Sequence, residues 1–332
     1  MTMENKESPW SSTLLMKVFH AADNAEIARP IVLTLGVFDG LHIGHQLIMK
    51  TVVERARAAG AMPTVITFEP HPRAVLHPES APPLLQTFDQ KIEALGVLGI
   101  EQTIVIHFDQ AFSQIRAEEF LREVIVDRLQ AKEVYLGRGF AFGHNREGHI
   151  DLLRKVSSQL GFLADEVPEV QIRGERVSSS RIRELILEGQ INLARRMLGR
   201  PYGVQGRVVR GAARGQKLGF PTANIDPQNR VIPKRGVYVT AILIDGQWRQ
   251  SVTNVGVRPT FGDATQSSIE THVLRWSDDL YERTVRVRFL HRLRDEKKFS
   301  SVDELKSQIE RDVGRAEDYF KRAGVRRSLT VI

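Results

Sequence analysis

Apolar and polar residues follow two different patterns along the chain. From residue 31 to about residue 171, short runs rich in β-branched residues come between longer stretches with apolar residues at helical spacing. The run 31–38 is almost continuously apolar, and the stretch 45–60 that follows it places residues such as Ile48 and Val52 on one helical face. Continuous apolar strands that alternate with helices are typical of a doubly wound parallel sheet. The first half of the chain therefore predicts an α/β domain.

The second half has the pattern of an all-β domain. Two short helical stretches, each ending in glycine, lead into it. Runs with strand character then follow at 203–211, 236–244, 247–256, 268–276 and 283–290. Asp245-Gly246 between two of these runs predicts a hairpin, and the residues from Ser300 return to helical spacing. We expect a small antiparallel β-barrel followed by a C-terminal helix, and we place the two domains at residues 14–198 and 199–332.

Composition narrows the class of protein. The 332 residues suit two domains of ordinary size, and the absence of cysteine excludes disulfides, cysteine-ligated metals and a cysteine nucleophile. The first thirty residues lack a signal-peptide core, and no later apolar run approaches the roughly 18 residues of a membrane-spanning helix. We therefore expect a cytoplasmic protein that does not enter the membrane.

The chain carries a formal net charge of +7. Such an excess suits nucleic acid, an anionic surface or anionic small substrates. A nucleic-acid-binding protein usually has a dense basic block with interleaved aromatic residues, whereas lysine and arginine are spread along this chain. We favour polyphosphate substrates; the nucleic-acid alternative predicts tight, salt-dependent binding to RNA or DNA. The sequence does not indicate an oligomeric state.

The segment Gly36–Gln46, GVFDGLHIGHQ, is the sharpest local signal. A strand ends there and a helix begins near His45, at the edge of the sheet where open α/β proteins bind ligands. A helix N-terminus offers free N–H groups to a phosphate, and Gly44 permits close backbone approach. His42 and His45 could both face that phosphate and donate hydrogen bonds as charge grows on an α-phosphate. Either histidine could instead cap the helix or pack in the core.

Three further segments carry polar and aromatic residues beside predicted strands or helices. They are Thr67–Pro72 (TFEPHP), Gly139–Gly148 (GFAFGHNREG) and Val177–Arg183 (VSSSRIR). The last one opens a helix, and a helix start that carries Arg181 and Arg183 suits a triphosphate. Taken alone, the first segment is also compatible with a rigid turn, and the serines of the last with an ordinary helix cap.

Together with Gly36–Gln46, these segments resemble the adenylyltransferase domain of the prokaryotic bifunctional riboflavin kinase/FAD synthetase family, over residues 17–189. The resemblance implies catalytic roles for His42 and His45 at the α-phosphate. It implies contacts to ATP or its phosphates from Gly36, Phe38, Asp39, Gly40, Gly44, Ser179, Ser180, Arg181 and Arg183. It implies contacts to the flavin from Phe68, Pro70, His71, Phe140 and Phe142.

One position departs from the family pattern. The family usually has Asp or Asn before the Phe-x-Phe-Gly segment, where this chain has Gly139. A polar contact to flavin or nucleotide is therefore missing at this position or supplied by another residue.

The second half contains the segment Gly219–Asn224, GFPTAN. Pro221 fixes its own φ angle, and Gly219 frees the backbone just before it. Thr222 and Asn224 project the same way if the segment is extended. A hydroxyl and an amide oxygen are hard ligands suited to Mg²⁺, which keeps phosphates in its coordination shell. In isolation such a segment is more often a structural turn.

The segments that follow GFPTAN resemble, in their order, the riboflavin kinase domain of the same family, over residues 200–309. This resemblance implies that the segment binds ATP through Gly219 and Pro221, and Mg²⁺ and phosphate through Thr222 and Asn224. It also implies that Glu270 is the catalytic base. Without the resemblance, Glu270 would be an ordinary solvated carboxylate on a strand.

The two resemblances together imply one bifunctional enzyme of flavin synthesis. It would phosphorylate riboflavin to FMN and adenylate FMN to FAD, with ATP and Mg²⁺ in both steps. The alternatives are a nucleotidylyltransferase of the nicotinate-mononucleotide or pantetheine-phosphate type, a nucleic-acid-binding protein, and a relative in which one half has lost its activity. GFPTAN and the β-rich second half argue against the first alternative. Gly139 makes the N-terminal half the one more open to loss.

Overall fold

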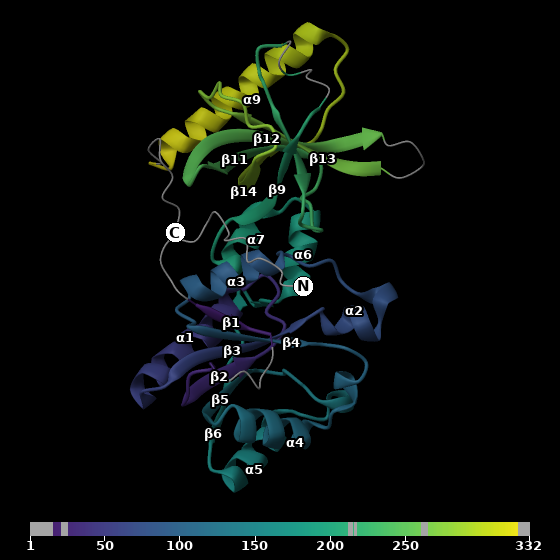
Figure 1. Cartoon of the computed structure of the whole chain (residues 1–332). Helices are drawn as coiled ribbons and strands as arrows, with labels where there is room; N and C mark the ends of the chain where they lie inside the picture. Colours follow the sequence, from purple (N-terminus) through teal and green to yellow (C-terminus); the bar gives the residue numbers. More distant parts are fainter. Residues whose placement is uncertain (1–15, 21–25, 212–214, 216–217, 260–264, 325–332) are drawn as a thin grey trace. The chain divides into compact units, whose positions relative to one another are not determined.

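The computed structural model of the chain describes residues 16–20, 26–211, 215, 218–259 and 265–324 (Figure 1). These residues fall into two compact units. One comprises the residues up to Pro83 together with Phe88–Ser178, and the other comprises Leu84–Thr87 with the residues from Ser179 onward.

The domain boundary expected between residues 198 and 199 stays a prediction. The two helical stretches before it, which we expected in the first domain, group with the second unit by their contacts. The outer ends expected for the two domains, residues 14 and 332, lie outside the described part of the chain.

The first unit is built on a parallel six-stranded sheet in the order β1-β4-β3-β2-β5-β6. The strands are β1 (Lys17–Phe19), β2 (Ile31–Leu35), β3 (Met62–Glu69), β4 (Gln102–His107), β5 (Ala131–Gly137) and β6 (Leu163–Val167). All residues of β2 are buried, because this strand lies between β3 and β5 and both its faces are covered. Burial on both faces is why its sequence is apolar without alternation.

Helices cover both faces of this sheet. They are α1 (Ile43–Ala59), α3 (Phe88–Val97), α4 (Ala117–Glu119), η3 (Phe120–Arg128) and α5 (Ile150–Leu160). Buried residues of α1 and α3 pack in one apolar cluster with Val32, whereas those of α4, η3 and α5 pack in another with Leu33. Neighbouring residues of a strand point to opposite faces, so the two clusters lie on opposite sides of the sheet. The predicted doubly wound α/β domain is confirmed.

Shorter elements complete the first unit. They are α2 (Pro72–Leu76), η1 (Pro78–Ser80), η2 (Phe112–Gln114), η4 (His144–Arg146) and the hairpin of β7 (Gln171–Ile172) and β8 (Glu175–Arg176). In the described part of the chain, no helix combines the length and the apolar character that crossing a bilayer requires.

The second unit contains a closed barrel with the strand order β10-β13-β12-β11-β14-β9, and every neighbouring pair is antiparallel. The strands are β9 (Tyr202–Val209), β10 (Ala223–Pro227), β11 (Gly236–Ile244), β12 (Gln247–Pro259), β13 (Thr265–Val273) and β14 (Thr284–Arg294). The runs predicted as strands all fall in this barrel. β10 is an additional strand that the pattern did not predict.

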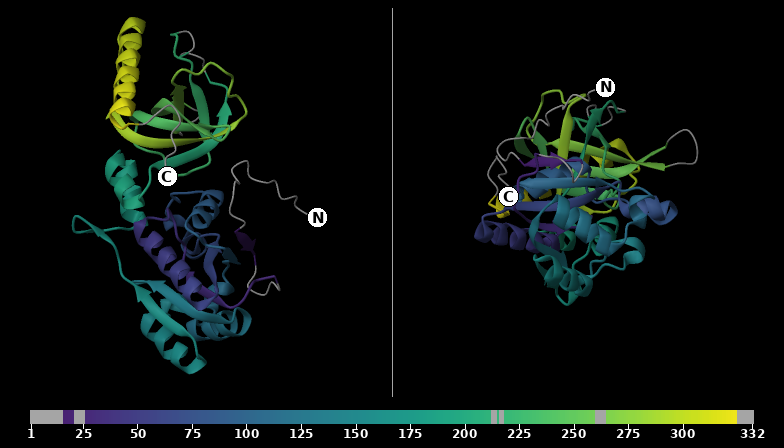
Figure 2. Two further views of the ribbon diagram at one scale, coloured as in Figure 1. Left: turned by 90° about the vertical axis from the view of Figure 1, so that its left-hand side faces the viewer. Right: turned by 60° about the horizontal axis from the view of Figure 1, so that its bottom comes forward.

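Helices accompany the barrel within the second unit: α6 (Ser179–Leu187), α7 (Ile191–Leu198) and α9 (Val302–Arg322). Figure 2 shows α9 running along the outside of the barrel. Its residues Ala316 and Phe320 are buried in an apolar cluster with Val239 and Ala241 of β11. The predicted barrel with a C-terminal helix is confirmed.

Candidate active sites

His42 and His45 lie where β2 gives way to α1. His42 is the N-cap of α1, and its Nδ1 accepts a hydrogen bond from the backbone N–H of His45 at 3.3 Å. The two imidazole rings stack, with centroids 3.6 Å apart and planes 18° from parallel. Because Nδ1 of His42 accepts, the proton of the neutral ring lies on Nε2. The two histidines thus form a stacked pair at a helix N-terminus.

The glycines of this turn leave space for its rings. A Cβ on Gly36 would lie 2.9 Å from the Phe38 ring, and one on Gly44 would lie 3.2 Å from Nδ1 of His42. Phe38 has a φ of 52° and packs edge-on against His45 with ring centroids 5.2 Å apart. Gly40 also has a left-handed φ, of 79°, which glycine adopts without strain. The turn therefore brings the predicted residues from Gly36 to His45 together, with Asp39 buried among them.

The residues expected to contact the flavin lie along an aromatic series in the first unit. Phe68 at the end of β3 is buried against Phe108 and Phe112, with ring centroids 6.0 and 6.1 Å away. Phe142 is buried against Phe120, and the half-buried Phe140 stacks on Phe142 at 6.4 Å. Phe112 and Phe120 join the two groups, at 6.0 Å from each other.

Pro70 and His71 continue the chain from the end of β3. The peptide bond before Pro70 is cis, and His71 is the N-cap of the short helix α2. Its Nδ1 accepts a hydrogen bond from the backbone N–H of Arg73 at 3.0 Å. His71 therefore has a structural role in this turn, whatever it contacts in a ligand.

Gly139 occupies the position where the family pattern has Asp or Asn. Its φ is 72°, and its backbone N–H donates to the Glu166 carboxylate at 3.4 Å. The carboxylate that lies beside this turn in the described structure therefore comes from β6.

Ser179, Ser180, Arg181 and Arg183 all lie in the first turns of α6, as the sequence predicted. Arg181 forms an ion pair with Glu184 at 3.3 Å, one turn along the same helix. These residues belong to the second compact unit, whereas His42 and His45 belong to the first. Their role as phosphate ligands stays a prediction.

A second group of polar residues lies on the barrel. Asn224 on β10 is directly opposite Glu270 on β13, and Glu270 is directly opposite Asn254 on β12. Residues that face each other across antiparallel strands project on the same side of the sheet. The barrel therefore places Glu270 between two amides, one of which was predicted as a metal ligand.

The turn before β10 is fixed by contacts that the sequence did not reveal. His272, two residues after Glu270, hydrogen-bonds through Nδ1 to the carbonyl of Pro221 at 2.9 Å, and its ring packs against Phe220. Gly219 has a φ of 85°, which favours glycine. A Cβ on Gly211 would lie only 2.2 Å from Nδ2 of Asn224. These contacts hold Thr222 and Asn224 at the start of the strand.

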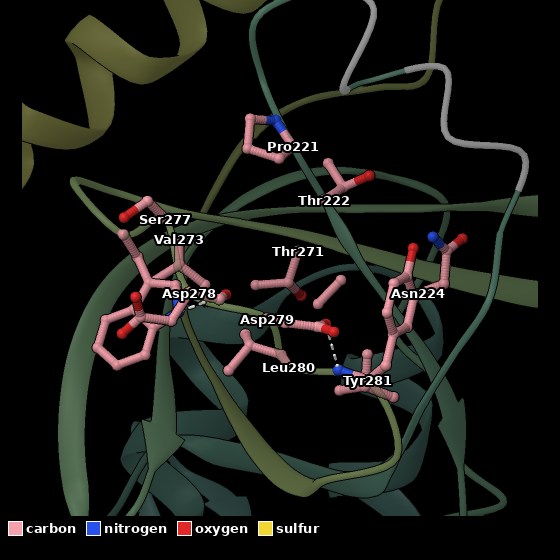
Figure 3. Close-up of a pocket in the computed structure, with 13 residues that line it drawn as sticks. Pro221, Thr222, Asn224, Thr271, Val273, Ser277, Asp278, Asp279, Leu280 and Tyr281 are labelled. Carbon is pink, nitrogen blue, oxygen red and sulfur yellow. Dashed lines mark hydrogen bonds between the residues drawn. The ribbon is translucent and has the colours of Figure 1, made fainter.

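Thr222 and Asn224 line a cavity of about 330 Å³ (Figure 3). They lie on one side of it, and Ser277 and Asp278 lie on the opposite side. Its apolar lining includes Leu280, and its polar lining continues with Thr271 and Asp279. Glu270 itself lies outside this lining, beside Asn224 on the neighbouring strand. Ala223 and Thr271, which face each other across the strands, project toward this cavity, whereas Asn224 and Glu270 project to the other face of the sheet. The predicted role of Thr222 and Asn224 as metal and phosphate ligands stays a prediction.

Sequence reasoning assigned no role to Lys91, His272, Gly211 or Asn254. The side chain of Lys91 is 6% exposed and donates to Oγ1 of Thr67, close to the turn that carries His42. The contacts of these residues depend on their burial and on the strand register. Neither can be read from the sequence around a single lysine, glycine or histidine.

Comparisons with known proteins cover both halves of the chain. The FAD synthetase family model matches residues 24–181, and the riboflavin kinase family model matches residues 198–320. The bifunctional riboflavin kinase/FMN adenylyltransferase of Pseudomonas fluorescens is 38% identical over 288 residues, which are 87% of this chain and 92% of that protein. The protein of the same name from Haemophilus influenzae is 34% identical over 307 residues, which are 92% of this chain and 99% of that protein.

A solved structure is also similar over both units. It is titled a macrolide-efflux protein from Streptococcus pneumoniae, with a TM-score of 0.82 and 30% sequence identity. The match covers 90% of this chain and 98% of that one. With both family models matched in order and curated relatives aligned over nearly their whole length, this chain belongs to the family of bifunctional riboflavin kinases/FMN adenylyltransferases.

Proposed function

We propose that the two activities of this family, phosphorylation of riboflavin to FMN and adenylylation of FMN to FAD, use separate sites in this chain. The observation that carries the proposal is the register of the barrel, which sets Glu270 beside Asn224, while His42 and His45 stack at the start of α1. We also propose ATP as the donor in both reactions and, from the lack of cysteine, a cytoplasmic location.

Adenylylation is assigned to the turn Gly36–His45. An oxygen of the FMN phosphate bonds to the α-phosphorus of ATP, and the bond from that phosphorus to the β-phosphate oxygen breaks, which releases pyrophosphate. The attacking phosphate is already ionised, so the site needs orientation and charge stabilisation more than a strong base. His42, through Nε2, and His45 would donate to the α-phosphate oxygens as their charge grows. The aromatic series that includes Phe68 and Phe140 would hold the flavin.

Phosphorylation is assigned to the barrel. Glu270 would accept the proton of the ribityl 5′-hydroxyl. The hydroxyl oxygen would bond to the γ-phosphorus of ATP, and the bond from that phosphorus to the β-phosphate oxygen would break, which releases ADP. Phosphoryl transfer asks the protein mainly for positioning and for stabilisation of charge. The triphosphate would lie beside Thr222 and Asn224, next to Glu270, which is directly opposite Asn224.

The side chains of Thr222 and Asn224 fit Mg²⁺. The Thr222 hydroxyl and the Asn224 amide offer oxygen ligands, and Gly211 leaves the room that Asn224 occupies. In the residues that the structure describes, no group of three or more acidic, histidine or cysteine side chains could hold a metal. A site with few protein ligands suits an ion that completes its shell with phosphate and water. Bound there, Mg²⁺ would neutralise charge on the transferred phosphate.

The test is a time course with the purified protein, riboflavin, ATP and Mg²⁺, with FMN and FAD resolved by chromatography. FMN should form first and FAD should follow at its expense, and EDTA in excess of the metal should stop the formation of FMN. FMN that accumulates without any FAD would show that the adenylylation half is inactive. Turnover of riboflavin that persists in EDTA would contradict the metal site.

A further inference from the structure

Lys91 on α3 is a buried cation beside the carboxyl ends of β2 and β3, near the turn that carries His42 and His45. Its side chain is 6% exposed. Nζ donates to Oγ1 of Thr67 at 3.2 Å and approaches the carbonyl of Val37 at 3.5 Å. Oγ1 of Thr67 also donates to that carbonyl at 3.4 Å. One ammonium group therefore joins the carboxyl ends of β2 and β3.

The charge of Lys91 is only partly compensated. Within the residues that the structure describes, it takes part in no ion pair, and both of its hydrogen-bond partners are neutral. Burial lowers its pKa, and the nearby carboxylates of Glu69 and Asp39 oppose only part of this shift. A methionine of similar length would fill the same space without the desolvation cost of an ammonium. Packing alone therefore does not explain a lysine here.

The contacts of Lys91 lead directly to the two histidines. Val37 precedes Phe38, whose φ of 52° turns the chain into the loop. Phe38 in turn packs edge-on against His45, which stacks on His42. A shift of the Val37 carbonyl would therefore move the ring that supports His45.

We propose that Lys91 is a positioning residue for adenylylation, which anchors the start of the Gly36–Leu41 turn through the Val37 carbonyl and the Thr67 hydroxyl and so sets His42 and His45. This inference rests on the proposed assignment of adenylylation to those histidines. Lys91 acts through the backbone and Phe38, so it should affect the rate of the chemical step more than the binding of either substrate.

The test compares Lys91→Met with Lys155→Met, a matched control on the exposed side of α5. For FAD formation from supplied FMN, Lys91→Met should lower kcat about 100-fold with little change in KM, because small misplacement of catalytic groups costs about that much. The kinase reaction, measured on the same preparation, should be unchanged. Thr67→Val, which removes the shared hydroxyl, should lower the same kcat by a smaller factor. Lys155→Met should change neither reaction.

The pH dependence gives a readout that a merely structural lysine would not move. Because the pKa of Lys91 is lowered, the folded wild-type protein should lose this charge, and with it FAD formation, at a pH below that of an ordinary lysine. The groups that bear on this titration are Asp39, in the loop, and Glu69, at the end of β3. The small remaining activity of Lys91→Met should lack this alkaline fall.

The outcomes separate the inference from the function on which it rests. His45→Ala serves as the reference variant. Suppose that His45→Ala lowers FAD formation but Lys91→Met leaves kcat within about threefold of wild type. That factor is too small for a positioning role, so Lys91 would then have no such role. A rise in KM at constant kcat, or equal loss of both reactions, would overturn the inference in the same way. If His45→Ala itself has no effect, the proposed adenylylation site has failed.

Discussion

At the scale of single residues, the proposed kinase site depends on the room that one glycine leaves. Asn224 lies directly opposite Glu270, and its side chain occupies the space next to Gly211. A methyl group at position 211 would overlap the Asn224 amide and displace it from the position proposed for the metal. Since Gly211 has no left-handed φ, only this contact makes a substitution costly.

We therefore expect Gly211→Ala to lower the rate of FMN formation from riboflavin about 100-fold, because the metal ligand is displaced. FAD formation from supplied FMN should be unchanged. Gly314→Ala is the control: nothing lies near its Cβ in α9, and it should leave both reactions intact while stabilising the helix by about 1 kcal/mol. Normal riboflavin kinase activity in Gly211→Ala would show that Asn224 can move without loss.

The sequence proposes residues for both sites where they lie in ordered motifs. His42 and Gly44 were proposed from their spacing beside a strand end, and Thr222 from the order of segments that resembles the riboflavin kinase domain; their roles stay predictions. Lys91 and His272 were not found, since each acts through a backbone carbonyl of a segment far away along the chain. No local pattern shows that a lysine on an amphipathic helix will point into the protein.

At the scale of elements, α9 is held on the barrel by a buried ion pair. Arg294 of β14 donates to both carboxylate oxygens of Asp312, at 2.7 to 3.2 Å, and Gln308 donates to one of them at 3.0 Å. Asp312 is 2% exposed. By contrast, Arg275 and Glu317 form a pair that is largely exposed to solvent.

Asp312→Ala should therefore destabilise the barrel unit by about 2–3 kcal/mol, because it leaves the charge of Arg294, whose side chain is 18% exposed, without its partner. Glu317→Ala on the same helix should cost less than about 1 kcal/mol. Urea unfolding followed by tryptophan fluorescence measures both, since Trp248 and Trp276 report on this unit. Equal effects of the two substitutions would show that burial of the first pair has no energetic consequence.

A second ion pair joins α1 to β5 and predicts that the stability of the first unit depends on pH. Arg55 hydrogen-bonds to both carboxylate oxygens of Glu133 at 2.8 and 2.9 Å, which lowers the pKa of Glu133. In acid, the unfolded chain therefore binds more protons than the folded chain. The stability that this pair contributes is complete above the unfolded pKa of about 4.3, and it is lost as the pH falls through the lower pKa of Glu133 in the folded protein.

Glu133→Gln should therefore lower the thermal midpoint of the first unit at neutral pH. The difference from wild type should shrink as the pH falls below the unfolded pKa of about 4.3, and it should vanish below the lowered folded pKa, where the carboxylate is protonated in both states. Scanning calorimetry at a series of pH values measures this. A difference that stays constant down to the acid limit would mean that the ion pair does not contribute.

Most helices and strands could be predicted from the hydrophobic pattern, but β10 could not. Ala223–Pro227 contains asparagine, aspartate and proline, which are depleted in strands. The segment is nevertheless a strand, because it pairs with β9 on one side and β13 on the other and so closes the barrel. Its conformation depends on partners that are distant in sequence, and a local pattern does not contain them.

At the scale of the whole molecule, the change of pattern halfway along the chain predicted the two kinds of fold. Continuous apolar strands such as β2 require cover on both faces, and the later runs with hairpin signals such as Asp245-Gly246 favour an antiparallel sheet. The assignment of α6 and α7 to a unit could not be predicted in this way, because a short helix next to a boundary carries no signal of the side on which it packs.

The proposed separation of the two activities into two sites makes a direct prediction about single substitutions. His45→Ala should lower FAD formation about 100-fold, by loss of a donor at the α-phosphate, and leave FMN formation from riboflavin intact. Glu270→Gln should abolish FMN formation and still convert supplied FMN into FAD. The decisive measurement is the time course of both products for these two variants, each checked for folding by circular dichroism. Loss of both reactions in either folded variant would contradict the separation of the two sites.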